Sequence, residues 1–243
     1  MGLERALLFL ALALLAEVAG TVGGFGSSVF FVPIGNFFFD FQTVLAITAI
    51  YHLLSNLSKL GLFRAGIDPR LLLWLGLPSV LFALLGSMAT PWLPVQALKM
   101  ALALFLIVLS GLLLLRDDWH LKPHPWVAVI GGAVSGGMAG LVGTGGAIRG
   151  LTLAAFQLPK EVFVATSAAI DMGIDVTRAA VYWRNGYVKM EDMAWIPLLA
   201  VIALAGTWIG RRWLRRIPQH AFRRIALGLV LLVGCVTLYE TLR

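Results

Sequence analysis

The stretch "AGLVGTGGAIRGLTLAAF", which starts at Ala139, places an arginine beside a cluster of glycines in otherwise apolar sequence. Each glycine inside a helix costs about 1 kcal/mol relative to alanine, so this spacing predicts a helix that is broken within an apolar segment. A broken helix exposes backbone N–H groups and the positive end of a helix dipole, which together suit an anion. Arg149 adds a permanent charge whose planar donors match the oxygens of sulfite, a sulfonate or a carboxylate.

A second glycine motif, "AGTVGGFGSSVFFVP" from Ala19 to Pro33, precedes the first by 120 residues. We expect the two motifs to form a seat for an anion, with hydroxyl donors added from both. An alternative stays open, in which the glycines only permit close helix packing and Arg149 extends to the membrane interface. The expected substrate-binding residues are Gly23, Gly24, Gly26, Ser27, Ser28, Thr144, Gly145, Gly146 and Arg149.

A second group of candidate residues consists of two polar stripes, one in each half of the chain. One stripe holds His52, Asn56 and Lys59, and the other holds Asp171, Asp175 and Arg178. Both have the spacing i, i+4, i+7, which places three side chains on one face of a helix, and corresponding members are 119 residues apart.

Charges inside a spanning helix usually face a partner or a water-filled path, and histidine titrates near neutral pH. The stripes therefore predict a gate and proton-coupling site. The alternative is a salt-bridged cluster with a packing role only. The predicted gating and proton-coupling residues are His52, Asn56, Asp171, Asp175 and Arg178.

Other chemistries lack their residues. No arrangement of nucleophile and base is apparent, and no His, Cys and carboxylate cluster has the spacing of a metal site. The single Cys235 excludes a disulfide within the chain. We therefore expect no catalytic residue, no metal and no cofactor.

The composition is that of a membrane protein. Of the 243 residues, 60% are hydrophobic and only 13% are charged, and the mean hydropathy is +0.90. The net charge of +7 comes from basic residues at the ends of apolar runs, which favours the positive-inside rule over nucleic-acid binding. The apolar start of the chain resembles a signal peptide, but apolar sequence follows it directly, so we interpret it as a retained membrane segment.

The offset of about 120 residues extends beyond the glycine motifs, because Pro78 and Pro197 also correspond. The sequence thus predicts an all-α polytopic protein with one transmembrane domain over 1–243, built from repeats at 6–115 and 126–240 and a linker at 116–125. Each repeat has about four hydrophobic segments, and the first is broken by glycines. The expected segments are 6–38, 41–62, 71–90, 96–115, 126–157, 161–184, 193–212 and 220–240.

The loop charges bear on topology. The first segment of each half is too long for one untilted span of about 20 residues, so it either crosses with an unwound centre or returns to its starting side. If both return, most of the basic loops share one side, as the positive-inside rule requires. Each half then makes an odd number of crossings, and the repeats are inverted copies, a common transporter design.

The chain resembles the TauE/SafE family of sulfite and sulfonate exporters. The resemblance covers nearly the whole chain and rests on "GTVGGFGSSVFFVP", "GLVGTGGAIRG", "VATSAAIDMGIDVTRAAVYWRNGYV" and "AGTWIGRRWLRRIPQHAFRRIALGLVLLVGC". It implies a multi-pass transporter of the bacterial inner membrane that moves small sulfur-containing or organic anions with protons. The chain departs from the family's motif at two places in the expected anion-binding site. It has Ser27–Ser28 where the family often has more glycine, and Arg149–Gly150 where a proline often occurs.

The leading hypothesis is a secondary transporter whose partners are a small anionic substrate and the lipid bilayer, with no nucleic acid. A passive anion channel, a membrane scaffold or assembly factor without transport, and a membrane enzyme are the alternatives. A homodimer stays open.

Overall fold

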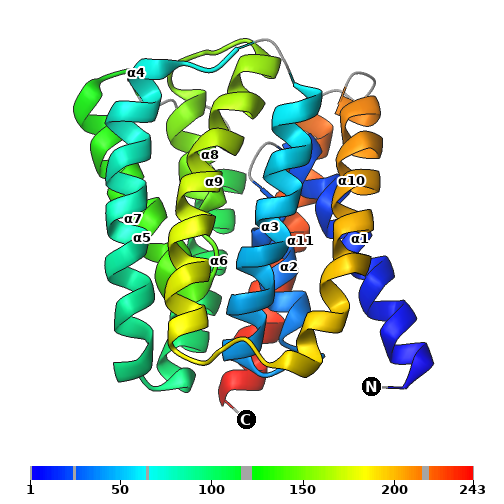
Figure 1. Ribbon diagram of the computed structural model, residues 1–243. Coiled ribbons are helices and arrows are strands. Elements are labelled where there is room, and N and C mark those ends of the chain that lie inside the picture. The colour runs from blue at the N-terminus through cyan, green and yellow to red at the C-terminus, as the bar shows by residue number, and fades with distance from the viewer. Residues whose placement is uncertain (1, 24–25, 64–65, 116–121, 215–218, 243) are drawn as a thin grey trace.

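The computed structural model describes residues 2–23, 26–63, 66–115, 122–214 and 219–242, and every regular element in these ranges is a helix. The helices stand roughly side by side as a bundle, with both termini at its lower end (Figure 1). The prediction of an all-helical protein is therefore confirmed.

The first half of the chain holds a long helix, a short one and three further helical stretches. The third stretch is continuous from Pro69 to Trp92, although its winding changes within it. The elements are α1 (Leu3–Gly23), α2 (Ser28–Gly35), α3 (Phe41–Leu62), α4 (Pro69–Leu71), η1 (Leu72–Gly76), α5 (Leu77–Ala89), η2 (Thr90–Trp92) and α6 (Val95–Leu115).

The second half follows the same order of long and short helices. Its elements are α7 (Pro125–Val142), α8 (Gly146–Ala154), α9 (Lys160–Arg184), η3 (Met190–Ala194), α10 (Trp195–Leu214) and α11 (Gln219–Leu242). Most of these limits lie within two or three residues of those expected from the sequence.

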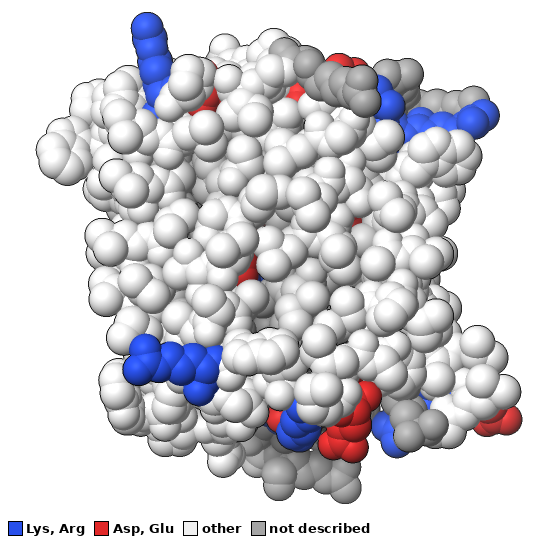
Figure 2. Space-filling view, viewed as in Figure 1, with Lys and Arg blue, Asp and Glu red and all other residues white. Residues whose placement is uncertain are grey.

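Five helical stretches of the described chain are long and apolar enough to cross a membrane. They are Leu3–Gly23, Pro69–Trp92, Val95–Leu115, Pro125–Val142 and Met190–Leu214. Figure 2 agrees, because its charged side chains gather near the two ends of the molecule, with a wide and almost uncharged band between them. A bilayer fits this band, since the hydrocarbon core is about 30 Å thick.

Glycines break the first segment of each half, as predicted. In the second half Gly143 ends α7 with φ of +80°, a left-handed conformation that favours glycine, and α8 begins at Gly146. In the first half Gly26, with φ of +81°, lies between α1 and α2. Each broken segment forms a hairpin that returns to the end of the bundle from which it started (Figure 1).

Glycine also lets helices of the two halves approach closely, so the packing alternative is right for several glycines. A Cβ atom on Gly136 of α7 would lie 2.0 Å from the Ser79 carbonyl oxygen of α5, and one on Gly140 would lie 2.4 Å from the Ala83 carbonyl oxygen. The opposite face of α7 is open, because a Cβ on Gly137 would meet nothing within 4 Å. Helix α7 therefore packs against α5 through a stripe of small residues.

We expect Gly136→Val to destabilise the protein by about 3 kcal/mol, because the added side chain forces α5 and α7 apart. The adjacent Gly137→Val is the control, since its side chain points into open space and should leave stability nearly unchanged. The measurement is the unfolding midpoint of both purified variants in detergent. Equal midpoints would contradict the tight α5–α7 contact.

A surface ion pair joins the halves at one end of the bundle. Asp40, which caps the start of α3, accepts a hydrogen bond from Lys189 at 2.6 Å and others from the Thr43 amide and hydroxyl. Burial alone would raise the pKa of Asp40, but these hydrogen bonds outweigh it and hold the pKa below its ordinary 3.8.

A depressed carboxyl pKa contributes stability above the unfolded-state value, and this contribution is lost as the pH falls through the folded value. We therefore expect the unfolding temperature of the wild type to fall more than that of Asp40→Asn between about pH 5 and pH 3. Parallel curves for the two proteins over this range would show that the pair adds nothing. The effect should be small, because both side chains are about half exposed.

Candidate functional site

The two polar stripes face each other across the interface of α3 and α9. The Asn56 side-chain amide donates to the Asp175 carboxylate at 2.8 Å, and Nδ1 of His52 lies 3.9 Å from the same oxygen. Asp171 also lies inside the bundle, eleven residues after the start of α9 at Lys160. The structure thus brings together side chains that the sequence places 119 residues apart.

Asp175 and Arg178 hold the end of the broken helix α7. Arg178 Nε donates to Asp175 at 2.8 Å, and its guanidinium also donates to the Gly143 carbonyl oxygen at 2.8 Å. The Tyr182 hydroxyl donates to the Gly140 carbonyl oxygen at 2.5 Å. The last carbonyl groups of a helix have no partner within it, so these side chains satisfy groups that the break exposes.

Arg149 projects from α8 toward α9, where both ends of its guanidinium donate to the Asp171 carboxylate. Its Nε donates to the Ser167 hydroxyl at 3.0 Å, and the residue is only 1% exposed. The alternative that Arg149 extends to the interface is therefore wrong. The partner of Asp171 is therefore not Arg178 of its own helix but Arg149 of α8, because the glycine break turns α8 toward α9.

A buried acid that the sequence analysis missed is Glu17, in the apolar helix α1. The side chain has no exposed surface, and its carboxylate accepts hydrogen bonds from four hydroxyl groups of different parts of the chain. The donors are Thr21 at 3.2 Å, Ser27 at 2.6 Å, Ser55 at 2.6 Å and Thr207 at 3.0 Å. One signal in the sequence pointed to it, since a lone acid in the middle of a membrane segment is expensive and usually functional.

Lys59 of α3 completes the Glu17 cluster. Its ammonium nitrogen lies 3.0 Å from a Glu17 oxygen and donates to the Ser55 hydroxyl at 2.6 Å. Lys59, Arg149 and Arg178 therefore each meet one carboxylate. The three buried ion pairs of the described interior carry no net charge while His52 is neutral.

Serines and a threonine near the two breaks connect these clusters. The Ser27 hydroxyl lies 2.9 Å from Nε2 of His52 while it bonds to Glu17, so it links the first ion pair to the α3 stripe. Ser28 donates to the Thr144 hydroxyl at 3.3 Å, which joins the first glycine break to the second. The Glu17 and Asp175 clusters are thereby part of one buried polar network.

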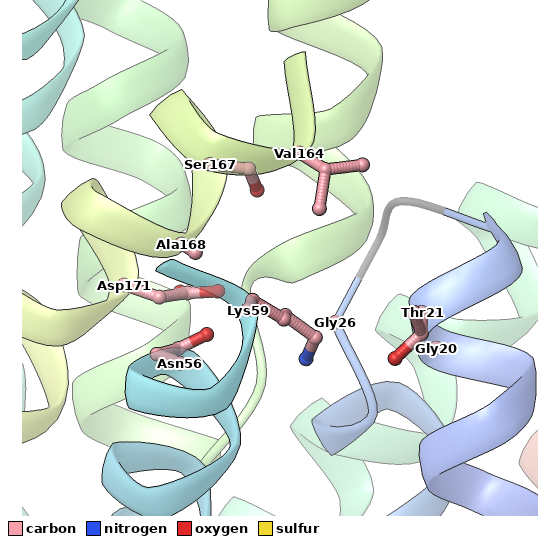
Figure 3. A pocket seen from close by; sticks show the side chains of 9 residues that line it. All are labelled: Gly20, Thr21, Gly26, Asn56, Lys59, Val164, Ser167, Ala168 and Asp171. Atoms are coloured by element: carbon pink, nitrogen blue, oxygen red, sulfur yellow. The ribbon is translucent and has the colours of Figure 1, made fainter. Parts of the chain in front are cut away.

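A small pocket lies between α1, α3 and α9, beside the first glycine break (Figure 3). In Figure 3 the carboxylate of Asp171 and the ammonium of Lys59 both point from the α9 and α3 side toward Gly26 and Thr21. Small apolar residues complete its wall. The polar and glycine residues that line it are Gly20, Thr21, Gly26, Asn56, Lys59, Ser167 and Asp171.

The pocket coincides only in part with the anion-binding site expected from the sequence. Gly26, Asn56 and Asp171 are predicted site residues that line the pocket, whereas Lys59 was placed in a stripe without a predicted role. Gly24 lies outside the described residues. The other predicted residues do not line the pocket; they are Gly23, Ser27, Ser28, His52, Thr144, Gly145, Gly146, Arg149, Asp175 and Arg178.

The model of the sulfite exporter family TauE/SafE matches residues 9–237. The chain belongs to the TauE/SafE family. No curated protein and no solved structure matches it. This match confirms the resemblance inferred from the sequence, and members of the TauE/SafE family are membrane transporters rather than enzymes.

In this TauE/SafE chain Gly145 does not have the left-handed backbone conformation that favours glycine. Its φ is −143°, which other residues adopt, so the left-handed glycine of the second break is Gly143 instead. A Cβ on Gly145 would nevertheless lie 1.8 Å from the Ser135 carbonyl oxygen. A bulky residue here breaks the contact of α8 with α7, so poor folding is expected rather than a selective loss of transport.

Asp175 has the contacts of a structural group, and we expect Asp175→Asn to lower stability by about 3–5 kcal/mol because Arg178 is left buried without its counter-charge. The measurement is the yield of folded protein and its unfolding midpoint. The matched control is Asp40→Asn, which removes a half-exposed acid and should leave both nearly unchanged. A fully stable Asp175→Asn variant would contradict this role.

Proposed function

We propose that this TauE/SafE protein is a secondary transporter of the bacterial inner membrane that moves a small sulfur-containing or organic anion together with protons. The pocket between α1, α3 and α9 carries the proposal, because a buried ammonium and a buried carboxylate both face it. Its lining charges suit a compact anion such as sulfite, thiosulfate or a short sulfonate.

Charge balance supports the coupling to protons. The described interior already pairs three cations with three anions, so an entering anion adds an uncompensated negative charge. An unpaired charge in a medium of low dielectric is costly. A proton on Asp171, the one carboxylate among the lining residues, restores neutrality and releases part of the Arg149 guanidinium.

We also infer that the halves are inverted repeats that rock about the pocket. Helix α3 rises in Figure 1 from blue at the bottom to cyan at the top, whereas α9 descends from lime at the top to yellow at the bottom. The pairing of α1 with α10 corresponds to that of α7 with α5. Transporters with such repeats bind substrate where the repeats meet.

Flux into proteoliposomes tests the proposal directly. Sulfite, thiosulfate, taurine and sulfoacetate are offered with and without a pH gradient. We expect at least one of them to accumulate against its gradient only when the pH gradient is present. Transport that ignores the pH gradient would indicate a passive channel, and the absence of any flux would favour a scaffold.

We expect Asp171→Asn to retain anion exchange but lose accumulation driven by the pH gradient, because the amide keeps the volume and cannot carry the proton. Exchange shows that the variant is folded, and accumulation reports the coupling. Asp40→Asn, outside the membrane band, is the control and should accumulate substrate normally. Normal accumulation by Asp171→Asn would refute the coupling role.

A further inference from the structure

The three buried cations of the described chain differ in how firmly they are held. Arg178 donates to Asp175 and to a backbone carbonyl oxygen at the end of α7. Arg149 donates through both ends of its fork to Asp171 and through Nε to Ser167. Neither arginine lines the pocket, and each is 1% exposed, so both guanidinium groups are fixed parts of the wall behind it.

Lys59 is held differently. It lines the pocket, and its ammonium ends a flexible stem of four carbons that can turn without moving the backbone of α3. In the described chain its ammonium contacts a carboxylate oxygen of Glu17 and the hydroxyl of Ser55. An ammonium is a compact charge that binds an oxyanion from any direction, whereas a guanidinium requires one plane.

Glu17 is built to tolerate the departure of its counter-ion. Four hydroxyl groups donate to its two carboxylate oxygens, at distances from 2.6 to 3.2 Å. Hydrogen bonds to the charged form stabilise a carboxylate even when no cation is near. In the described chain the side chains that donate to Asp171 and Asp175 are Arg149, Arg178 and Asn56 rather than hydroxyl groups, so the charges of these two acids depend on the arginines.

We propose that Lys59 is the residue that binds the transported anion, and that Glu17 with its four hydroxyl donors is the resting partner of the Lys59 ammonium. On arrival of the anion, the ammonium turns from Glu17 into the pocket and donates to an oxygen of the anion. On departure it returns to Glu17. This assignment rests on the proposed transport of small anions and names the group that recognises them.

In this proposal Lys59, rather than Arg149, recognises the anion. Arg149 was the expected anion-binding residue, yet its donors are engaged by Asp171 and Ser167. In this scheme Arg149 sets the charge of the pocket wall and Lys59 contacts the ligand. Asn56, whose amide lies at the same wall, adds a neutral neighbour.

Sulfite flux in proteoliposomes, measured against sulfite concentration, tests the assignment. Lys59→Met should raise the KM for sulfite by roughly 10- to 100-fold, the loss expected for a hydrogen bond between charged groups. Lys59→Arg keeps the charge and should recover part of the affinity. Glu17→Gln removes the resting partner and should lower the KM, because the ammonium then has no competing carboxylate.

The double variant Glu17→Gln/Lys59→Met separates binding from folding. It removes the ion pair as a unit, so it leaves no unpaired buried charge and should fold better than Lys59→Met. We expect the double variant to keep the high KM of Lys59→Met. A double variant with the KM of the wild type would overturn the proposal, because the pair would then have only a structural role.

Two controls complete the design. Asp40→Asn/Lys189→Met removes another lysine–carboxylate pair, one that is exposed at the end of the bundle, and it should leave the KM unchanged. A wild type that moves none of the four test anions would refute the proposed function itself. A wild type that moves sulfite, together with an unchanged KM in the double variant, would refute the role of Lys59 alone.

Discussion

The interior of this protein depends on the pairing of charges that have been removed from water. Three cations and three carboxylates lie within the described bundle, and a buried charge that has neither a counter-charge nor hydrogen-bond partners is strongly destabilising. Each pair therefore also fixes the position of the elements that supply it. Glu17 and Lys59 join α1 to α3, and Arg149 with Asp171 joins α8 to α9. The third pair, Asp175 and Arg178, lies on α9 and fastens the end of α7.

The glycine breaks make this pairing geometry available. An unbroken helix would carry Arg149 along the axis of α7, whereas the turn at Gly143 redirects α8 so that the arginine meets Asp171. The break leaves carbonyl groups without helical partners, and Arg178 and Tyr182 satisfy them. Backbone of this kind is tolerated at membrane depth because protein side chains surround it. The breaks and the buried charges thus require each other.

Sequence patterns predicted the helices and the stripes well, because helical periodicity and apolar length are local properties. The limits expected for α3, 41–62, agree with the structure, and the spacing of Asn56 and Asp175 anticipated that their stripes correspond. Partner choice was harder. Asp171 could have paired along its own helix, and only the path of the chain through the break brings Arg149 to it. Glu17 was missed because it lies in an apolar start that resembled a signal peptide. Comparison of the two halves did not reveal Glu17 either, because the position 119 residues later is occupied by Gly136 and not by an acid.

Lys59 and Arg178 occupy corresponding places in their stripes, yet their surroundings differ in a way that suits different tasks. Arg178 finds its acid three residues away on the same helix, so that pair moves with α9 as one body. In the first stripe Asn56 stands where the second has Asp175, so Lys59 has no acid three residues before it on α3. Its acid comes from α1, across an interface beside the pocket. A pair within one helix is indifferent to movement between helices, but a pair between helices depends on their separation. The Glu17–Lys59 contact is therefore the ion pair that a shift of α1 against α3 would alter first, and it is also the one whose cation faces the pocket. In the proposed transport cycle, binding of the anion and movement of the first broken segment are coupled through the same ammonium.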